Sequence, residues 1–110
     1  MSGEFPKKGE VFWVALDPTI GSETKKTRPC MIVSSNEGNK RSNLVIVAPL
    51  TSKTVRVFTF ECKVVVNGTK GKVMLNQIRT IDKSRLFKKE PNVEINIKEL
   101  NLAIKKTLGL

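Results

Sequence analysis

The 110-residue chain contains no histidine and no tyrosine, and its aromatic residues are limited to five Phe and one Trp. Without histidine, serine–histidine and cysteine–histidine nucleophiles and histidine-ligated metal sites are excluded. The two cysteines, Cys30 and Cys62, cannot complete a four-ligand zinc site, and both fall in apolar runs typical of buried free thiols. We therefore expect neither a metal nor another cofactor.

Long hydrophobic runs are also missing. No apolar stretch is long enough to span a bilayer, and the N-terminus lacks the pattern of a signal peptide. The length predicts one domain over residues 1–110. Two free cysteines fit a reducing compartment, so we expect the protein in the cytoplasm. Residues 1–7 carry no periodicity and are expected to form a flexible tail.

Acidic residues are scarce, because ten Asp and Glu face twenty Lys and Arg and leave a net charge of +10. Such a surface attracts polyanions, so nucleic acid or an acidic protein is the expected partner. A membrane surface is disfavoured, because the chain has no basic amphipathic helix with bulky apolar residues opposite the charges.

Short apolar runs at tight spacing predict an antiparallel β-barrel rather than a parallel sheet. Asn67-Gly68 is a strong hairpin signal, residues 34–43 are expected to be a polar turn, and Pro49 is expected to end a strand. Residues 78–82 are expected to continue irregularly. The expected strands cover residues 11–16, 30–33, 44–48, 57–66, 72–75 and 85–87.

The last segment changes from the period of strands to that of a helix. Ile97, Leu100, Ile104 and Leu108 are spaced three, four and four residues apart and share one helical face. Asn96 precedes them as an N-cap, and a glycine follows them where a helix usually stops. The predicted fold is therefore mainly β, a small barrel with a C-terminal helix.

Two polar segments at strand ends, residues 16–29 and 49–52, are the candidate functional loops. Arg28 precedes a proline, which favours an extended backbone and fixes the root of a side chain suited to phosphate. Together with the carboxylate of Glu23 and the hydroxyl of Thr51, it could support metal-free RNA cleavage. That reaction requires a proton acceptor, charge stabilisation on the phosphate and a proton donor for the leaving oxygen.

Five motifs occur in an order that closely resembles the MazF/PemK family, from about Lys8 to Leu86. They are Gly9-Glu10-Val11, Leu16-Asp17-Pro18-Thr19-Ile20-Gly21-Ser22-Glu23, Thr27-Arg28-Pro29, Pro49-Leu50-Thr51-Ser52 and Gln77-Ile78-Arg79-Thr80-Ile81-Asp82. The resemblance implies an SH3-like barrel with a C-terminal helix that works as a homodimer. It also implies a toxin of a bacterial toxin–antitoxin pair, inhibited by an acidic, mostly disordered MazE-like antitoxin tail that covers the RNA groove.

The implied activity is metal-independent cleavage of single-stranded RNA at short sequences, leaving a 2′,3′-cyclic phosphate and a 5′-hydroxyl. The family's catalytic arginine and threonine fall on Arg28 and Thr51, and its loop glutamate falls on Glu23. The residues expected to contact RNA are polar or basic: Thr19, Ser22, Lys25, Lys26, Thr27, Ser52, Lys53, Asn76 and Gln77.

One departure separates this chain from the Kid/PemK branch, which resembles it but uses a histidine in the first loop and an Arg-x-Asp pair. Ser22, Met74 and Asn76 occupy those places here, so the MazF-like set is the one available. Three alternatives remain at this point: a non-catalytic toxin similar to the gyrase poison CcdB, an inactive RNA-binding member, and a general RNA-binding barrel. The low aromatic content disfavours the last, because such barrels commonly stack bases on aromatic rings.

Overall fold

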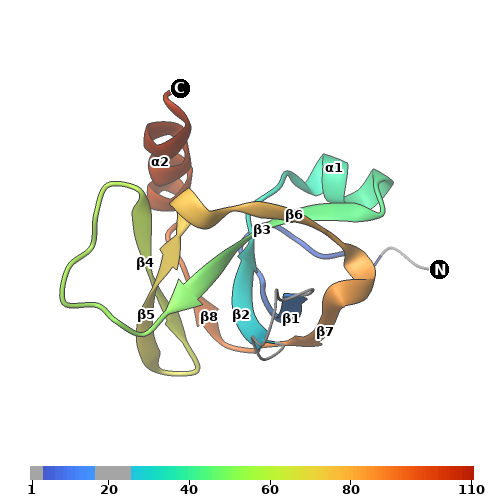
Figure 1. The fold of residues 1–110 in the computed structure, drawn as a ribbon, viewed down its shortest axis with the longest axis horizontal. Coiled ribbons are helices and arrows are strands. Elements are labelled where there is room, and N and C mark those ends of the chain that lie inside the picture. The colour runs from blue at the N-terminus through green and yellow to red at the C-terminus, as the bar shows by residue number, and fades with distance from the viewer. Residues whose placement is uncertain (1–3, 17–25) are drawn as a thin grey trace, which may run out of the picture.

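A computed structural model describes residues 4–16 and 26–110 of the chain (Figure 1). The described strands are β1 (Val11–Leu16), β2 (Lys26–Ile32), β3 (Leu44–Thr51), β4 (Glu61–Val66), β5 (Thr69–Met74), β6 (Arg79–Asp82), β7 (Leu86–Lys89) and β8 (Val93–Glu94). The described helices are α1 (Asn36–Arg41), η1 (Leu75–Gln77), η2 (Lys83–Arg85) and α2 (Ile97–Leu108). The strands form one antiparallel sheet in the order β7-β1-β2-β3-β5-β4-β8, with β6 paired to β3. The predicted mainly β fold with a C-terminal helix is confirmed.

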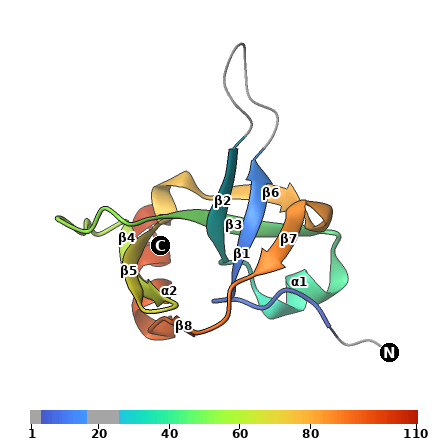
Figure 2. The same ribbon diagram turned by 90° about the horizontal axis from the view of Figure 1, so that it is seen from below.

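Strand β3 connects the two halves of the sheet. Its first part pairs with β2 and β6, and its last two residues, Leu50 and Thr51, pair with β5. The hydrophobic core is divided accordingly. A smaller cluster lies under β1, β2, β3 and β6, and a larger one includes Leu100 and Ala103 of α2. Figures 1 and 2 show α2 beside β4 and β5, at the opposite side of the molecule from β7.

The prediction that Pro49 ends a strand is wrong, because β3 continues to Thr51. Proline lacks an N–H and is tolerated where a ladder bond is not needed. Pro49 pairs with Cys30 on one side. On its other side it falls between the described pairings of β3 with β6, which stop at Val47, and with β5, which start at Leu50. The missing donor therefore lies at the point where β3 changes partner.

The predicted strand over residues 57–66 is shorter than expected, because β4 begins at Glu61. The rings of Phe58 and Phe60 stack on each other with centroids 5.1 Å apart, and both residues precede Glu61, the first residue of β4 that pairs with β5. The Glu61 carboxylate also accepts a hydrogen bond from the Phe58 backbone N–H at 2.9 Å. Residues 52–60 therefore form a segment that projects from the sheet between β3 and β4 (Figure 2).

The predicted polar turn over residues 34–43 contains helix α1. Ser35 caps it, since its hydroxyl accepts the Gly38 N–H at 3.2 Å. Asn39 is fully buried, and its amide donates to the Ser34 carbonyl oxygen at 3.1 Å. These side-chain hydrogen bonds satisfy backbone groups at the start of the helix. The helix itself has little apolar periodicity, so the hydrophobic pattern of the sequence did not indicate it.

The remaining strands differ mainly at their ends. β2 starts earlier than the apolar run that predicted it, at Lys26, and β5 starts earlier as well, at Thr69. Residues 79–82, expected to be irregular, form β6 because they pair with β3 over four positions. β7 starts at Leu86, one residue later than predicted, and ends at Lys89.

The predicted hairpin and C-terminal helix are confirmed. Asn67 and Gly68 have φ of 50° and 82°, the left-handed values that a two-residue turn between β4 and β5 requires. The Asn96 side chain accepts the Glu99 N–H at 3.1 Å at the start of α2, and Gly109 ends the helix with φ 75°. Among the described residues, no helix has the length and apolar character needed to cross a bilayer.

Candidate active site

A groove of about 600 Å³ lies where β2, the end of β3 and the β4–β5 hairpin meet, and we call it the central groove. Four of the predicted site residues line it: Thr27, Arg28, Thr51 and Ser52. They come from two segments that the sequence separates and that β2–β3 pairing brings together. The two candidate functional segments therefore meet at one surface, as expected.

Arg28 lies on strand β2 and is half-buried, whereas the sequence placed it on an exposed loop. The reason is that β2 pairs with β1 from its first residue, with Arg28 opposite Val14. An extended backbone before proline fits this pairing. The guanidinium Nη2 donates to the Leu50 carbonyl oxygen at 3.2 Å, which holds the side chain against the end of β3. Arg28 lines the central groove, and its guanidinium carries further N–H donors.

Thr51 is the last residue of β3 and follows the carbonyl that Arg28 contacts. Its hydroxyl oxygen accepts the Lys53 N–H at 3.2 Å, so its lone pair is partly engaged and its own proton is free to be donated. Strand β5 runs very close to it, because a Cβ built on Gly71 would lie 2.9 Å from the Thr51 carbonyl oxygen. Glycine at position 71 therefore allows Thr51 to sit at this wall of the groove. We call Arg28, Thr51 and Ser52 the Arg28 cluster.

A buried ion pair lies behind the Arg28 cluster. Lys72, which is opposite Thr51 in the β3–β5 pairing, contacts the Glu61 carboxylate at 2.9 Å. Both side chains are less than 10% exposed, at 9% and 6%. The Lys72 ammonium also donates to the Arg56 carbonyl oxygen at 2.7 Å. These contacts tie the projecting segment, residues 52–60, to the sheet next to Thr51.

A second group in the groove was not predicted from the sequence. Glu90, just after β7, accepts a hydrogen bond from the indole N–H of Trp13 at 2.9 Å and one from the Asn67 amide at 3.1 Å. All three line the central groove together with Lys70. We call Trp13, Asn67 and Glu90 the Glu90 cluster. No local motif marks these positions, because the contact between Trp13 and Glu90 joins residues 77 positions apart.

Several predicted site residues are not placed in the groove. Thr19, Ser22, Glu23 and Lys25 lie outside the described residues, as does the side chain of Lys26, whose backbone begins β2. Lys53 is exposed beside Thr51. Asn76 and Gln77 are exposed on η1, and Gln77 donates to the Met74 sulfur at 3.5 Å. Their contact with RNA stays a prediction.

The electrostatics of the groove wall also affect Cys30, which is fully buried behind it. Burial raises the pKa of the Cys30 thiol to about 11, and the charges of Arg28 and Arg79 oppose part of that rise. Burial and the Glu99 charge likewise raise the pKa of Cys62. Both cysteines are free and buried, as predicted, and at neutral pH both are protonated and therefore poor nucleophiles.

A metal site needs several acidic, thiolate or imidazole ligands close together. Among residues 4–16 and 26–110, no three His, Cys, Asp or Glu side chains are close enough together to hold an ion. The described polar groups in the central groove are instead a guanidinium, an ammonium, hydroxyls, an amide, an indole N–H and a carboxylate. Such groups can stabilise charge on a phosphate and exchange protons with it.

Comparisons with known proteins identify relatives of this chain. The sequence model of the PemK-like, MazF-like toxins of type II toxin–antitoxin systems matches residues 7–108. The endoribonuclease MazF of Staphylococcus saprophyticus is 36% identical, over 94% of this chain and 92% of its own length.

Two solved structures share the fold. A mycobacterial endoribonuclease in complex with its cognate antitoxin is 26% identical, with a TM-score of 0.70 and 96% of each chain covered. The MazE–MazF structure from Deinococcus radiodurans is 25% identical, with a TM-score of 0.71 and the same coverage. The family model and the staphylococcal relative both extend over nearly the whole chain, so this chain belongs to the PemK-like, MazF-like toxins of type II toxin–antitoxin systems.

Proposed function

We propose that this toxin is an endoribonuclease that cuts single-stranded RNA, messenger RNA in particular, at short sequences without a metal ion. In the proposed reaction the 2′-hydroxyl of the substrate attacks the adjacent phosphorus, and the P–O5′ bond breaks. The products are a 2′,3′-cyclic phosphate and a 5′-hydroxyl. The observation that carries the proposal is the meeting of Arg28 and Thr51 at one wall of the central groove.

Each group has a task in this reaction. The Arg28 guanidinium stabilises the additional negative charge that develops on the phosphate oxygens, where a fixed donor is worth most. The Thr51 hydroxyl lies at the same wall and hydrogen-bonds the departing 5′-oxygen, which gains its proton from solvent through this hydroxyl. A carboxylate takes the proton of the 2′-hydroxyl, and Glu23 is the proposed base. Because every atom of the nucleophile comes from the substrate, the chain needs no activated water.

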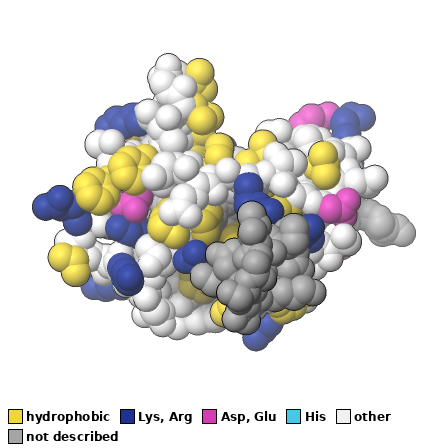
Figure 3. Space-filling model, viewed as in Figure 1, with side chains coloured by type: hydrophobic (Ala, Val, Ile, Leu, Met, Phe, Trp, Pro, Cys, Tyr) yellow, Lys and Arg dark blue, Asp and Glu magenta, His cyan; other side chains and the backbone are white. Residues whose placement is uncertain are grey.

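The charge of the protein supports RNA as the substrate. A net charge of +10 raises the local concentration of polyanions. Lys70 lines the central groove and Lys53 is exposed beside Thr51. Lys and Arg side chains are spread over the face that carries β4, β5 and residues 52–60 (Figure 3). An extended RNA strand crossing the groove would meet positive charge on either side of Arg28.

The test is a cleavage assay on a long single-stranded RNA in the presence of EDTA, followed by mapping of both new ends. We expect cutting to persist in EDTA and to yield 5′-hydroxyl ends and 2′,3′-cyclic phosphates. Ends with a 5′-phosphate, or activity that returns only when a divalent ion is added, would contradict the proposal.

The same groove is the proposed site of inhibition by an acidic, MazE-like antitoxin. A disordered segment rich in Asp and Glu can occupy the positive potential near Arg28, Lys53 and Lys70, and so exclude RNA. Titration of such a peptide into a complex with an uncleavable RNA analogue should release the RNA. A ternary complex with undiminished RNA affinity would place the inhibitor elsewhere. The two free cysteines and the RNA target fit action in the cytoplasm, where thiols stay reduced.

We also propose that the working unit is a two-fold homodimer. The apolar run of residues 64–66 does not supply a large exposed surface for this dimer, because Val64 is buried in the core and Val65 and Val66 are half-buried. The unused apolar surface lies instead beside α2, where Ile46, Ile78 and Ile104 line a hollow next to the exposed Leu108. Figure 3 shows hydrophobic side chains along this flank of α2. Sedimentation at micromolar concentration should show a dimer, and a monomer there would contradict this proposal.

A further inference from the structure

We propose that the Glu90 cluster is a base-recognition site of the central groove, and that it binds a nucleobase carrying an exocyclic amino group. The inference rests on the proposed action on RNA and adds a recognition element to it. Three observations carry it: the fixed orientation of the Glu90 carboxylate, the lack of a cationic partner for it among the described residues, and the aromatic ring hydrogen-bonded to it.

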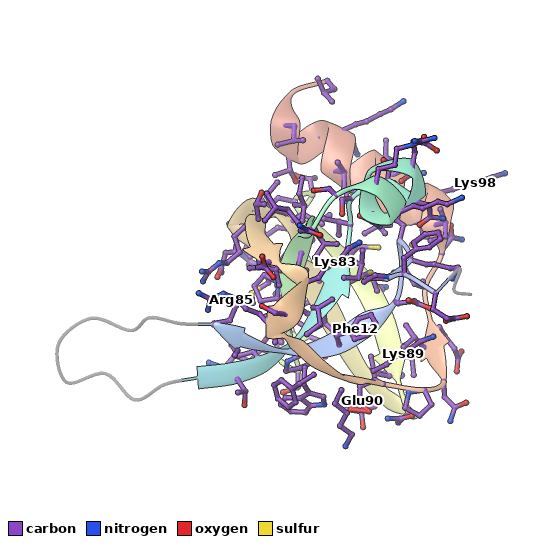
Figure 4. All side chains as sticks on the ribbon, turned by 90° about the vertical axis from the view of Figure 1, so that its right-hand side faces the viewer. Phe12, Lys83, Arg85, Lys89, Glu90 and Lys98 are labelled. Carbon is purple, nitrogen blue, oxygen red and sulfur yellow. The ribbon has the colours of Figure 1, made fainter. Side chains whose placement is uncertain are left out.

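The orientation of the carboxylate is set from both sides. The Trp13 indole N–H binds Oε2 at 2.9 Å, and the Asn67 amide binds Oε1 at 3.1 Å. The backbone is held too, because the Glu90 N–H donates to the Val11 carbonyl oxygen at 2.8 Å. Glu90 lies at the end of β7, next to Lys89 (Figure 4). Strand β1, the β4–β5 hairpin and the end of β7 thus converge on one half-buried carboxylate.

Both donors to this carboxylate are neutral. Over the ranges that the structure describes, no Lys or Arg nitrogen lies within ion-pair distance of Glu90, whereas Glu10, Glu37 and Glu61 each have a cationic partner. Each carboxylate oxygen can accept more than one hydrogen bond, so acceptor capacity is left over. The Glu90 cluster therefore presents negative charge inside a groove that otherwise suits a polyanion.

This charge selects what part of an RNA strand can lie there. A phosphate is repelled, so the strand must turn a base or a sugar towards Glu90. Amino groups of cytosine, adenine and guanine donate hydrogen bonds to a carboxylate. Uracil has no amino group, and its one N–H lies between two carbonyl oxygens that a carboxylate repels. Glu90 therefore favours amino-bearing bases and disfavours uracil.

Trp13 supplies a surface for the same base. The ring is half-buried and lines the groove, and it is fixed by the bond to Glu90. Aromatic side chains of this kind stack with bases in single-stranded nucleic acid complexes. Trp13 lies opposite Pro29 in the β1–β2 pairing, and both residues line the same central groove as Arg28. A base bound there would be close to the phosphate that Arg28 contacts.

Trp13 is also the single tryptophan of the chain, so its fluorescence reports this site directly. We would titrate the protein with short oligo(A), oligo(C) and oligo(U) RNAs that are 2′-O-methylated to prevent cleavage. The variants are Glu90→Gln and a matched control, Glu94→Gln, which removes the same charge from an exposed position on β8.

For the wild-type protein we expect oligo(A) and oligo(C) to bind roughly tenfold more tightly than oligo(U), within the range of a specific base contact. The preference should fall to about twofold or less in Glu90→Gln and persist in Glu94→Gln. An equal preference in wild type and Glu90→Gln, or tighter binding of oligo(U) to the wild type, would overturn the proposal.

A second measurement needs no protein variant. Purine riboside in place of adenosine removes the amino group and keeps the ring. Binding to the wild type should then weaken by about the same factor that separates oligo(A) from oligo(U). Equal binding of the two purines would also overturn the proposal.

Cleavage assays on unmodified RNA separate this inference from the proposed function. If the wild type discriminates between bases but never cuts RNA, the base site stands and the proposed activity fails. If the wild type cuts RNA and Glu90→Gln leaves the sequence preference unchanged, the activity stands and the base site fails.

Discussion

The two clusters of the central groove are built on different supports. The Arg28 cluster rests on backbone contacts and on a buried ion pair: Arg28 binds the Leu50 carbonyl, and the Lys72–Glu61 pair lies behind Thr51. The Glu90 cluster has no such pair among the described residues and is held by two hydrogen bonds from neutral donors. The first arrangement keeps positive charge fixed at the wall, and the second leaves negative charge available to a ligand.

This difference in support indicates that the two clusters have different functions. A buried ion pair tolerates little movement, because separating the charges or removing one of them is costly. Fixed donors are what charge stabilisation in a transition state requires. Hydrogen bonds from neutral donors to a charged group contribute about 1.5–3 kcal/mol each, and the carboxylate that they orient keeps capacity for a further donor. We therefore assign chemistry to the Arg28 cluster and recognition to the Glu90 cluster.

Arg28→Ala should have the largest effect, because it removes the one guanidinium of this cluster. We expect the cleavage rate to fall at least about a thousandfold, the upper range for loss of a fixed charge-stabilising donor. The fold should be retained. Rates on a fluorogenic RNA and circular dichroism spectra test both statements. Arg41→Ala is the matched control, since Arg41 is exposed on α1 and pairs with Glu37. A normal rate in Arg28→Ala would separate this cluster from the chemistry.

Lys72→Met tests the support of the Arg28 cluster. Removing the lysine leaves the Glu61 carboxylate buried without a cation, and we expect a loss of about 3 kcal/mol in the free energy of unfolding. Urea denaturation measures this loss. The double variant Lys72→Met with Glu61→Leu should regain much of the stability, because no buried charge is left. If the single variant is as stable as the wild type, the pair does not support Thr51.

Thr51→Ala should reduce the cleavage rate about a hundredfold, less than the arginine variant, because one neutral hydroxyl is lost and the guanidinium remains. Thr51→Ser should retain most of the activity, since it keeps the oxygen that accepts the Lys53 N–H. Thr80→Ala, on the exposed side of β6, is the control. Equal rates for Thr51→Ala and the wild type would remove the hydroxyl from the mechanism.

The smallest predicted effect is the change in stability with pH that Cys30 causes. This change reports whether water reaches the thiol behind Arg28. Its pKa is raised from 9.0 to about 11, so the unfolded chain loses the thiol proton first as the pH rises. Stability should therefore be unaffected by this group below pH 9 and fall above it, by about 1.4 kcal/mol at pH 10. Cys30→Ala should show a correspondingly smaller decrease between pH 8 and pH 10. Identical pH profiles would mean that the thiol is accessible to water.

The sequence predicted those parts of the fold that local patterns determine. Asn67-Gly68 and the Asn96-to-Gly109 helix were recognised because their turn and cap residues carry the signal. Helix α1 was missed because its stability comes from the buried side chain of Asn39, which a hydrophobic pattern does not reveal. The strand length of β3 was missed because the change of partner at Pro49 is a tertiary feature.

The same distinction holds for the groove. Arg28 and Thr51 could be predicted, because each lies in a short motif next to a strand end. Glu90 could not, since its role depends on contacts with Trp13 and Asn67, 77 and 23 positions away. Nothing in the residues around Glu90 distinguishes it from a solvated charge. The burial of Lys72 is similarly invisible in a strand that otherwise alternates lysine with small residues.

The central claim is that the chemistry at the Arg28 cluster uses the 2′-hydroxyl of the substrate. The most direct test compares two oligonucleotides that contain a mapped cleavage site and differ by one oxygen, a ribose or a 2′-deoxyribose immediately 5′ of the cut. Both are incubated with the wild-type toxin in EDTA, and binding is followed by Trp13 fluorescence. We predict that both bind and that only the ribose substrate is cut. Cleavage of the deoxyribose substrate at a comparable rate would contradict the account.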